Sequence, residues 1–291
     1  SYYYSFNTSM GLVSVFDGCG GAGARKYERY GMKTGAYMAS RAIAGAAKDW
    51  FAELTEGSFR DSDKAVLESK MNQYLAICKN TAGNTASGIK SKLAKDFPST
   101  ASIILFTADD AGITAHCIWA GDSRCYLLDE DGLKQLTEDD LDGLNAMENL
   151  TADGILTNVV SASKPFVLHQ KTIKTKAPAI LFGATDGCFG YFSTPMEFEN
   201  LLLSSLFAVD NIVQWEAGMK NVLEGIAGDD FTLSGAGLGF GSFERLKEYF
   251  AERYRFLNQE YINGLQRKTY DEKVQLWEEY RKPYEMLLTK G

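Results

Sequence analysis

The chain has 291 residues, of which 45% are hydrophobic and 23% are charged, so it can bury a sizeable core and lacks the composition of a disordered chain. Thirty Lys and Arg against 38 Asp and Glu give a formal net charge of -8, which disfavours nucleic acid as a partner. Five cysteines without a Cys-x-x-Cys pair suit a reducing compartment, and we find neither a signal peptide nor an apolar run of about 20 residues, so we expect a cytoplasmic protein without a membrane span.

The first half of the chain predicts a hairpin, two helical stretches and a meander of short strands. A tyrosine-rich strand over residues 1–6, a polar turn at 7–9 and an apolar strand that ends at Asp17 indicate the hairpin. Helical spacing follows over residues 22–50, as one long helix or as two helices broken near Gly31, and again over 63–95. Acidic turns then separate four expected strands: 101–107, 113–120, 124–128 and 133–136.

The second half combines a polar stretch with further strands and helices. Residues 136–165 are polar and aperiodic, which predicts a loop with short helices. The next expected elements are two strands, two helices and a last strand: 166–173, 179–185, 196–207, 211–225 and the segment after Asp230. This order does not alternate as a parallel doubly wound sheet would, so it favours antiparallel sheets covered by helices.

From residue 243 onward, charged and aromatic residues recur at helical spacing. We predict a main domain over residues 1–241 and an appended helical extension over 242–291. Seven apolar side chains of the extension are expected to bury one helix face: Phe243, Leu246, Tyr249, Phe250, Tyr254, Leu257 and Tyr261. This face would pack against the main domain, with contact to a partner as the alternative.

Three aspartates stand at the boundaries of apolar strands. Asp17 and Asp186 each end such a run and precede a glycine, and Asp229 lies just before the last strand. Each Asp-Gly pair taken alone is explained as a turn at the end of a strand. Carboxylates gathered at the edge of a core repel one another, however, so the three together favour a cation site. Oxygen ligands select Mg²⁺ or Mn²⁺, and a chain with only 2 histidines gives little support for zinc.

Six short motifs follow one another in the order Val15-Phe-Asp-Gly-Cys-Gly-Gly21, Ser99-Thr100-Ala101, Gly121-Asp122-Ser123-Arg124, Leu136-Thr-Glu-Asp-Asp140, Thr185-Asp186-Gly187 and Asp229-Asp230-Phe231-Thr232. Together they resemble the motifs of the PP2C (PPM) family of metal-dependent protein phosphatases. The resemblance covers residues 1 to about 238. It implies an α+β fold in which two central antiparallel sheets pack face to face and are flanked by helices.

The resemblance also implies two Mg²⁺ or Mn²⁺ ions and hydrolysis of phosphoserine or phosphothreonine in phosphorylated protein substrates. By match of motif, Asp17 bridges both metals, Gly18 offers its carbonyl to one, and Asp186 and Asp229 complete the other. Asp139 resembles the acid that holds a third, weaker metal. Two cations ~3.5–4 Å apart can share a water and lower its pKa towards ~7, so no protein nucleophile is required.

Three departures from the family pattern bear on activity. Cys19 replaces a histidine, and a neutral thiol is a poor general acid. A further acidic ligand is not evident near residues 161–165, and the family's phosphate-binding arginine and acidic pair would lie upstream of Ser1. We interpret residues 122–124 as a structural turn. The alternative function is therefore a catalytically weak scaffold that binds a partner through residues 243–291.

Overall fold

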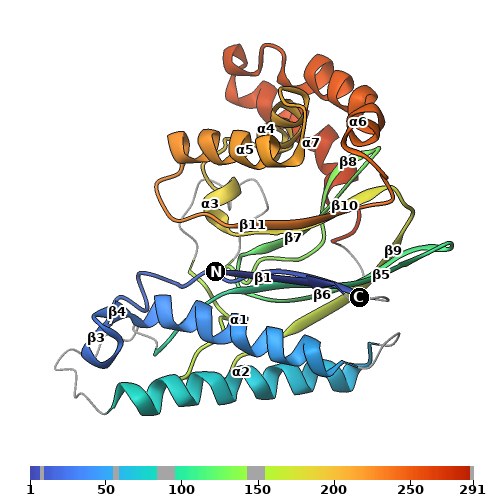
Figure 1. Cartoon of the computed structure of the whole chain (residues 1–291). Helices are drawn as coiled ribbons and strands as arrows, with labels where there is room; N and C mark the ends of the chain where they lie inside the picture. The colour runs from blue at the N-terminus through green and yellow to red at the C-terminus, as the bar shows by residue number, and fades with distance from the viewer. Residues whose placement is uncertain (7–9, 55–58, 84–95, 143–154, 289–291) are drawn as a thin grey trace.

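The computed structural model describes residues 1–6, 10–54, 59–83, 96–142 and 155–288 (Figure 1). Two antiparallel sheets lie face to face between two helical layers. The larger sheet has the strand order β1 (Tyr2–Phe6), β2 (Gly11–Val15), β5 (Ala101–Asp109), β6 (Gly112–Ala120) and β9 (His169–Thr175). The smaller sheet has the order β11 (Leu233–Leu238), β10 (Ala179–Ala184), β7 (Arg124–Asp129) and β8 (Gly132–Gln135). The predicted α+β fold class is confirmed.

The space between the sheets is filled by apolar side chains from both of them. They form one cluster that includes Val13, Ile104, Cys117, Cys125, Leu127 and Leu181. Helices cover the outer faces, so β2 and β10 are buried along their whole length. Burial on both faces explains why these two strands are continuous apolar runs in the sequence.

The larger sheet is covered by α1 (Gly35–Glu53) and α2 (Asp61–Ala82). The expected helix over residues 22–50 begins late, because β3 (Lys26–Tyr27) and β4 (Lys33–Thr34) form a small hairpin before it. Gly31 and Met32 in this hairpin have φ values of 61° and 65°, which are incompatible with a right-handed helix. The Thr34 hydroxyl then accepts a hydrogen bond from the Tyr37 amide at 3.1 Å and caps α1.

The described parts of other predicted segments differ modestly from expectation. The second helix ends at Ala82, and the remainder of its predicted range, 84–95, lies outside the described residues, as does the turn at 7–9. The polar stretch after β8 forms isolated bridges, such as Leu141 with Leu156, in its described parts. Residues 143–154 of this stretch lie outside the described residues.

Five helices accompany the smaller sheet: α3 (Asp186–Phe189), α4 (Pro195–Phe207), α5 (Ile212–Ile226), α6 (Phe243–Leu257) and α7 (Tyr270–Tyr284). Aromatic contacts join this layer to the sheet. The Tyr126 ring on β7 stacks on Phe182 of β10 at 5.0 Å and lies 5.7 Å from the ring of Phe198 on α4. Among the helices in the described ranges, none is sufficiently long and apolar to cross a bilayer.

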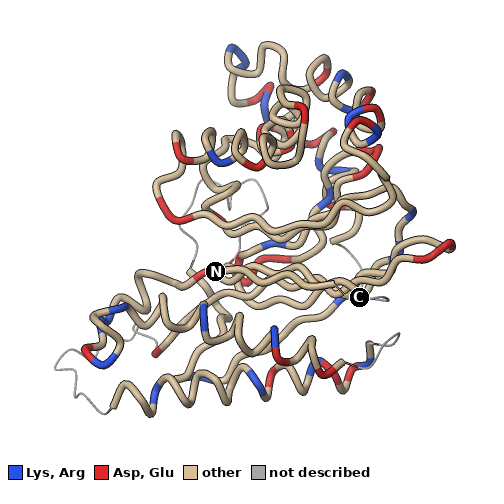
Figure 2. Tube along the Cα trace, in the orientation of Figure 1, with Lys and Arg blue, Asp and Glu red and all other residues tan. Residues whose placement is uncertain are grey.

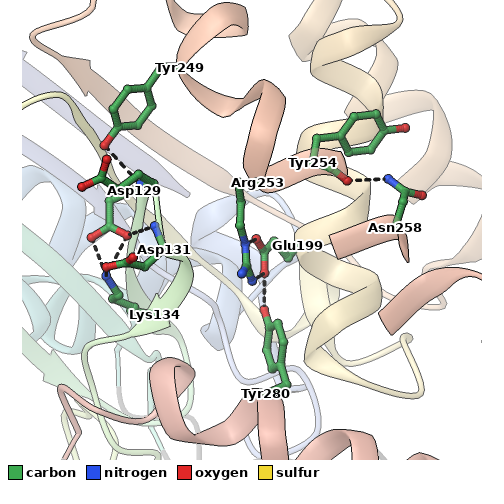
Figure 3. Close-up of polar contacts among 10 residues, drawn as sticks. Asp129, Asp131, Lys134, Glu199, Tyr249, Arg253, Tyr254, Asn258 and Tyr280 are labelled. Atoms are coloured by element: carbon green, nitrogen blue, oxygen red, sulfur yellow. Dashed lines mark hydrogen bonds and ion pairs between the residues drawn. The ribbon is translucent and has the colours of Figure 1, made fainter. Parts of the chain in front are cut away.

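The predicted apolar face of the C-terminal extension is buried. Leu246, Phe250, Leu257 and Tyr261 lie in the same core cluster as α4 and β10, and the other three predicted side chains pack against it partly buried. Polar contacts reinforce this packing: Glu199 of α4 binds Arg253 of α6 and Tyr280 of α7 (Figure 3). The domain boundary at residue 241 stays a prediction.

Candidate functional site

The ends of two buried strands bring carboxylates together. Asp17 follows β2, and Asp186 follows β10 in the facing sheet, where the two side chains share a hydrogen bond. The segment before β11 runs beside them, because the Thr185 amide donates to the Thr232 carbonyl at 3.0 Å. Asp229, at the start of that segment, is close enough to raise the pKa of Asp17. The structure therefore brings Asp17 and Asp186 together and places Asp229 within electrostatic reach of Asp17.

The electrostatics of this cluster are unfavourable without a cation. Burial raises the pKa of Asp17 to about 9, and the negative charges of Asp186, Asp122 and Asp229 act in the same direction. Within the described residues, no three Asp, Glu, His or Cys side chains are arranged closely enough to hold an ion by themselves. An Mg²⁺ or Mn²⁺ ion fits the oxygen-only donor set, and would complete its shell with a backbone carbonyl and water.

The structure adds Asp122 to this cluster, although the sequence predicted only a structural turn at residues 122–124. Burial raises the pKa of Asp122 to about 7, and the negative charges of Asp186 and Asp139 act in the same direction. A signal for it was present in the sequence. Asp122 follows the apolar strand β6 and a glycine, so it also stands where a buried strand ends.

Asp139 lies beside this cluster in an ion pair. The Arg124 Nε donates to Asp139 Oδ1 at 2.9 Å and Nη2 donates to Oδ2 at 2.6 Å, and the two side chains are only 1% and 4% exposed. The guanidinium also lies 4.2 Å from the centre of the Phe189 ring. A bidentate pair of this kind fixes the Asp139 carboxylate firmly. Its role as a ligand of a third metal stays a prediction.

Asp140 fastens the turn that carries Asp122. Its Oδ2 accepts hydrogen bonds from the Gly121 amide at 2.8 Å and from Asn158 Nδ2 at 2.7 Å. Its Oδ1 lies 2.8 Å from Nε2 of His169, whose ring packs 5.2 Å from that of Trp119. Through Asp140, these contacts tie the turn at Gly121 to Asn158 and His169. They hold the turn that carries Asp122 in place.

The backbone around Asp17 is held just as closely. The Thr100 amide and the Ser99 hydroxyl each donate to the Asp17 carbonyl at 2.7 Å. A Cβ atom on Gly18 would lie 2.3 Å from the Ala36 carbonyl oxygen in the first turn of α1, so no larger residue fits there. The glycine after Asp17 is therefore required for the contact between the strand end and the helix.

We expect Gly18→Ala to destabilise the fold by about 1–3 kcal/mol, because its new methyl group would meet helix backbone that cannot move freely. Gly20→Ala is the matched control, since a Cβ atom there meets nothing within 4 Å, and should change stability by less than about 0.5 kcal/mol. Urea unfolding of both variants is the measurement. Equal stability of the two variants would contradict the close contact between Gly18 and α1.

Arg41 of α1 lies within electrostatic reach of the Ser1 amino group. The Ser1 amino group donates to the Phe16 carbonyl at 2.6 Å, which places it next to Asp17. The pKa of this amino group is lowered mainly by burial and further by Arg41, whereas Asp17 and Asp230 raise it.

Comparisons with known proteins establish the fold. Neither protein-family models nor curated proteins match the chain. Solved structures do, among them serine/threonine phosphatase PstP/Ppp of Mycobacterium tuberculosis, with a TM-score of 0.55, 13% identity and coverage of 82% of this chain and 92% of that one. Stp1 of Staphylococcus aureus has a TM-score of 0.56, 15% identity and coverage of 82% and 88%. A PstP catalytic domain in complex with 2 manganese ions has a TM-score of 0.53, 16% identity and coverage of 81% and 90%. The chain therefore has the fold of PP2C-type serine/threonine phosphatases.

Proposed function

We propose that the protein hydrolyses phosphoserine or phosphothreonine in protein substrates with the help of Mg²⁺ or Mn²⁺. The observation that carries this proposal is the hydrogen-bonded pair of Asp17 and Asp186, drawn from facing sheets and joined electrostatically by Asp122 and Asp229. Like charges gathered in a buried place repel one another, and a bound cation would relieve that repulsion. Support also comes from the shared fold, because its solved members include serine/threonine phosphatases and one of them is a complex with 2 manganese ions.

In this proposal Asp17, the Gly18 carbonyl, Asp186 and Asp229 would hold two ions, and Asp139 with Asp122 would serve a weaker third. When bound, such a pair of ions supplies Lewis acidity and an activated water. The chain itself positions these ligands. Ser99 and Thr100 hold the backbone of Asp17, and the Asp186 carboxylate accepts a hydrogen bond from the Gly187 amide at 2.8 Å.

The second candidate is a catalytically weak scaffold. Cys19 stands where the resemblance places a histidine, and a thiol with a pKa near ~8.5 is a poor proton donor to a leaving alkoxide. Under this alternative the fold would bind a partner, and the residues 243–291 would provide the contact. The two candidates differ in turnover, not in metal binding.

Chelation and metal add-back test the first candidate. Excess EDTA is expected to abolish hydrolysis of a phosphothreonine peptide, and excess Mn²⁺ should restore it, because the protein offers no other nucleophile in this mechanism. Thermal unfolding with and without Mn²⁺ is measured in parallel. Full activity in EDTA would end the hypothesis of metal dependence. Mn²⁺-induced stabilisation without turnover would favour the scaffold.

A further inference from the structure

A small basic surface projects from this acidic protein beside the candidate site. The β3–β4 hairpin and its flanks, residues 25–34, contain four basic residues and one acidic one: Arg25, Lys26, Arg29, Lys33 and Glu28. The whole chain carries a formal net charge of -8, so this hairpin differs in sign from the chain as a whole. Figure 2 shows the basic positions grouped at β3 and β4. We call this hairpin together with Arg41 the basic platform.

The hairpin is anchored rather than loosely attached. The Arg29 Nη1 donates to the Thr81 carbonyl at 3.2 Å, and the Tyr30 hydroxyl donates to the Cys78 carbonyl at 3.1 Å, both in the last turns of α2. The Tyr27 ring stacks on Phe97 at 4.9 Å. Three contacts to neighbouring elements fix its orientation, so its outward side chains present a defined surface.

Two of these outward cations converge on one aromatic ring. The Lys33 Nζ lies 4.7 Å and the Arg41 Cζ lies 3.6 Å from the centre of the Tyr37 ring. Lys26, Lys33 and Arg41 are exposed, and across the described ranges none of them has a carboxylate oxygen within 4.0 Å. Like charges held on one ring repel each other, and an anionic ligand would relieve that repulsion.

The basic platform adjoins the carboxylate cluster through the start of α1. The Ala36 amide donates to the Gly23 carbonyl at 3.1 Å and the Gly35 amide to the Arg25 carbonyl at 2.8 Å, so the start of α1 joins the hairpin to the glycine loop after Asp17. The same turn of α1 packs on Gly18. A peptide with its phosphorylated residue at the cluster would therefore extend over the start of α1 to the basic platform.

From these observations, and resting on the function proposed above, we infer that the basic platform binds an acidic segment flanking the phosphorylated residue of a protein substrate. An extended acidic peptide matches it in charge, and the start of α1 that packs on Gly18 also holds the hairpin. Nucleic acid also carries negative charge, but the overall charge of the protein opposes a long polyanion. The basic platform would thus select among phosphoproteins by the charge of the flanking sequence.

The test compares three phosphothreonine peptides that carry acidic, neutral or basic residues on the N-terminal side of the phosphothreonine. A second set of three peptides varies the C-terminal side in the same way. With Mn²⁺ present, the acidic flank on one side should raise kcat/KM on the order of 3- to 10-fold over the neutral peptide. Lys33→Glu with Arg41→Glu should remove this preference and favour the basic flank instead. A merely damaged enzyme would lose rate on all peptides without inverting the preference.

The matched control reverses two exposed charges in the C-terminal helical region, Arg267→Glu with Lys282→Glu, and should keep the acidic preference.

Fluorescence anisotropy of the same labelled peptides gives a readout that needs no turnover. Equal affinities for acidic and neutral peptides would overturn the inference even in an inactive protein. A single-stranded DNA oligonucleotide that binds as tightly as the acidic phosphopeptide at the same salt concentration would overturn the choice of partner. Absence of hydrolysis of every peptide, with the preference in binding intact, would instead count against the proposed activity.

Discussion

Asp186→Asn is expected to reduce Mn²⁺-dependent hydrolysis of a phosphothreonine peptide by at least about 100-fold. Substitution of a residue that only hydrogen-bonds to a metal ligand already lowers metal affinity or activity by about 10- to 100-fold. The substitution keeps the shape of the side chain but removes one charge from the cluster. Asp186 is the neighbour whose charge contributes most, after burial, to the raised pKa of Asp17. Removing it should weaken the hold on a cation more than any change at the surface.

The same variant should show an opposite effect on the metal-free fold. Without the charge of Asp186, the buried Asp17 carboxyl has a smaller like-charge repulsion, so metal-free stability should stay equal or rise. Stabilisation by Mn²⁺ should be lost. Thermal unfolding with EDTA and with Mn²⁺ measures both parts, and separates loss of a ligand from loss of folding.

Asp230→Asn is the matched control for Asp186→Asn. Asp230 is exposed next to Asp229. Its activity should stay within about threefold of the original protein, because ordinary surface substitutions change little. An unaltered rate in a folded Asp186→Asn protein would show that Asp186 is not a ligand.

Glu199→Ala is expected to destabilise the protein by about 3–5 kcal/mol, because it leaves a buried guanidinium without its partner. Glu199 is fully buried and accepts from Arg253 Nε at 2.7 Å, Arg253 Nη2 at 2.8 Å and the Tyr280 hydroxyl at 2.5 Å (Figure 3). Three helices meet at this carboxylate. Its loss should lower the melting temperature by on the order of 10 °C.

Glu224→Gln provides the control for the Glu199 prediction. Glu224 pairs with Lys220 at 3.5 Å, but its side chain is 55% exposed, so the change should cost less than about 0.5 kcal/mol. A double variant, Glu199→Leu with Arg253→Met, should recover much of the lost stability, since replacing both buried charges removes the unpaired one. A Glu199→Ala protein as stable as Glu224→Gln would mean that this network does not secure the C-terminal helices.

The sequence by itself determined the elements whose cause is local. Largely apolar runs predicted β2, β5 and β10, because a strand covered on both faces carries apolar residues at most positions. Asp17 and Asp186 follow such runs directly in the chain, so their place at strand ends needed no tertiary information. The apolar face of α6 was equally visible, since helical spacing alone puts those side chains on one side.

Tertiary structure decided which of these pieces meet. Asp122 looked like a turn residue, and it joins the cluster only because β7, which follows its turn, pairs with β10, which delivers Asp186. The helix expected from residue 22 begins only at Gly35, because the residues before it form the β3–β4 hairpin. That hairpin contacts α2 through Arg29 and Tyr30. The link between Glu199, Arg253 and Tyr280 spans 81 residues of sequence. Charge proximity and burial are properties of packed neighbours, and no local pattern of residues encodes which neighbours those will be.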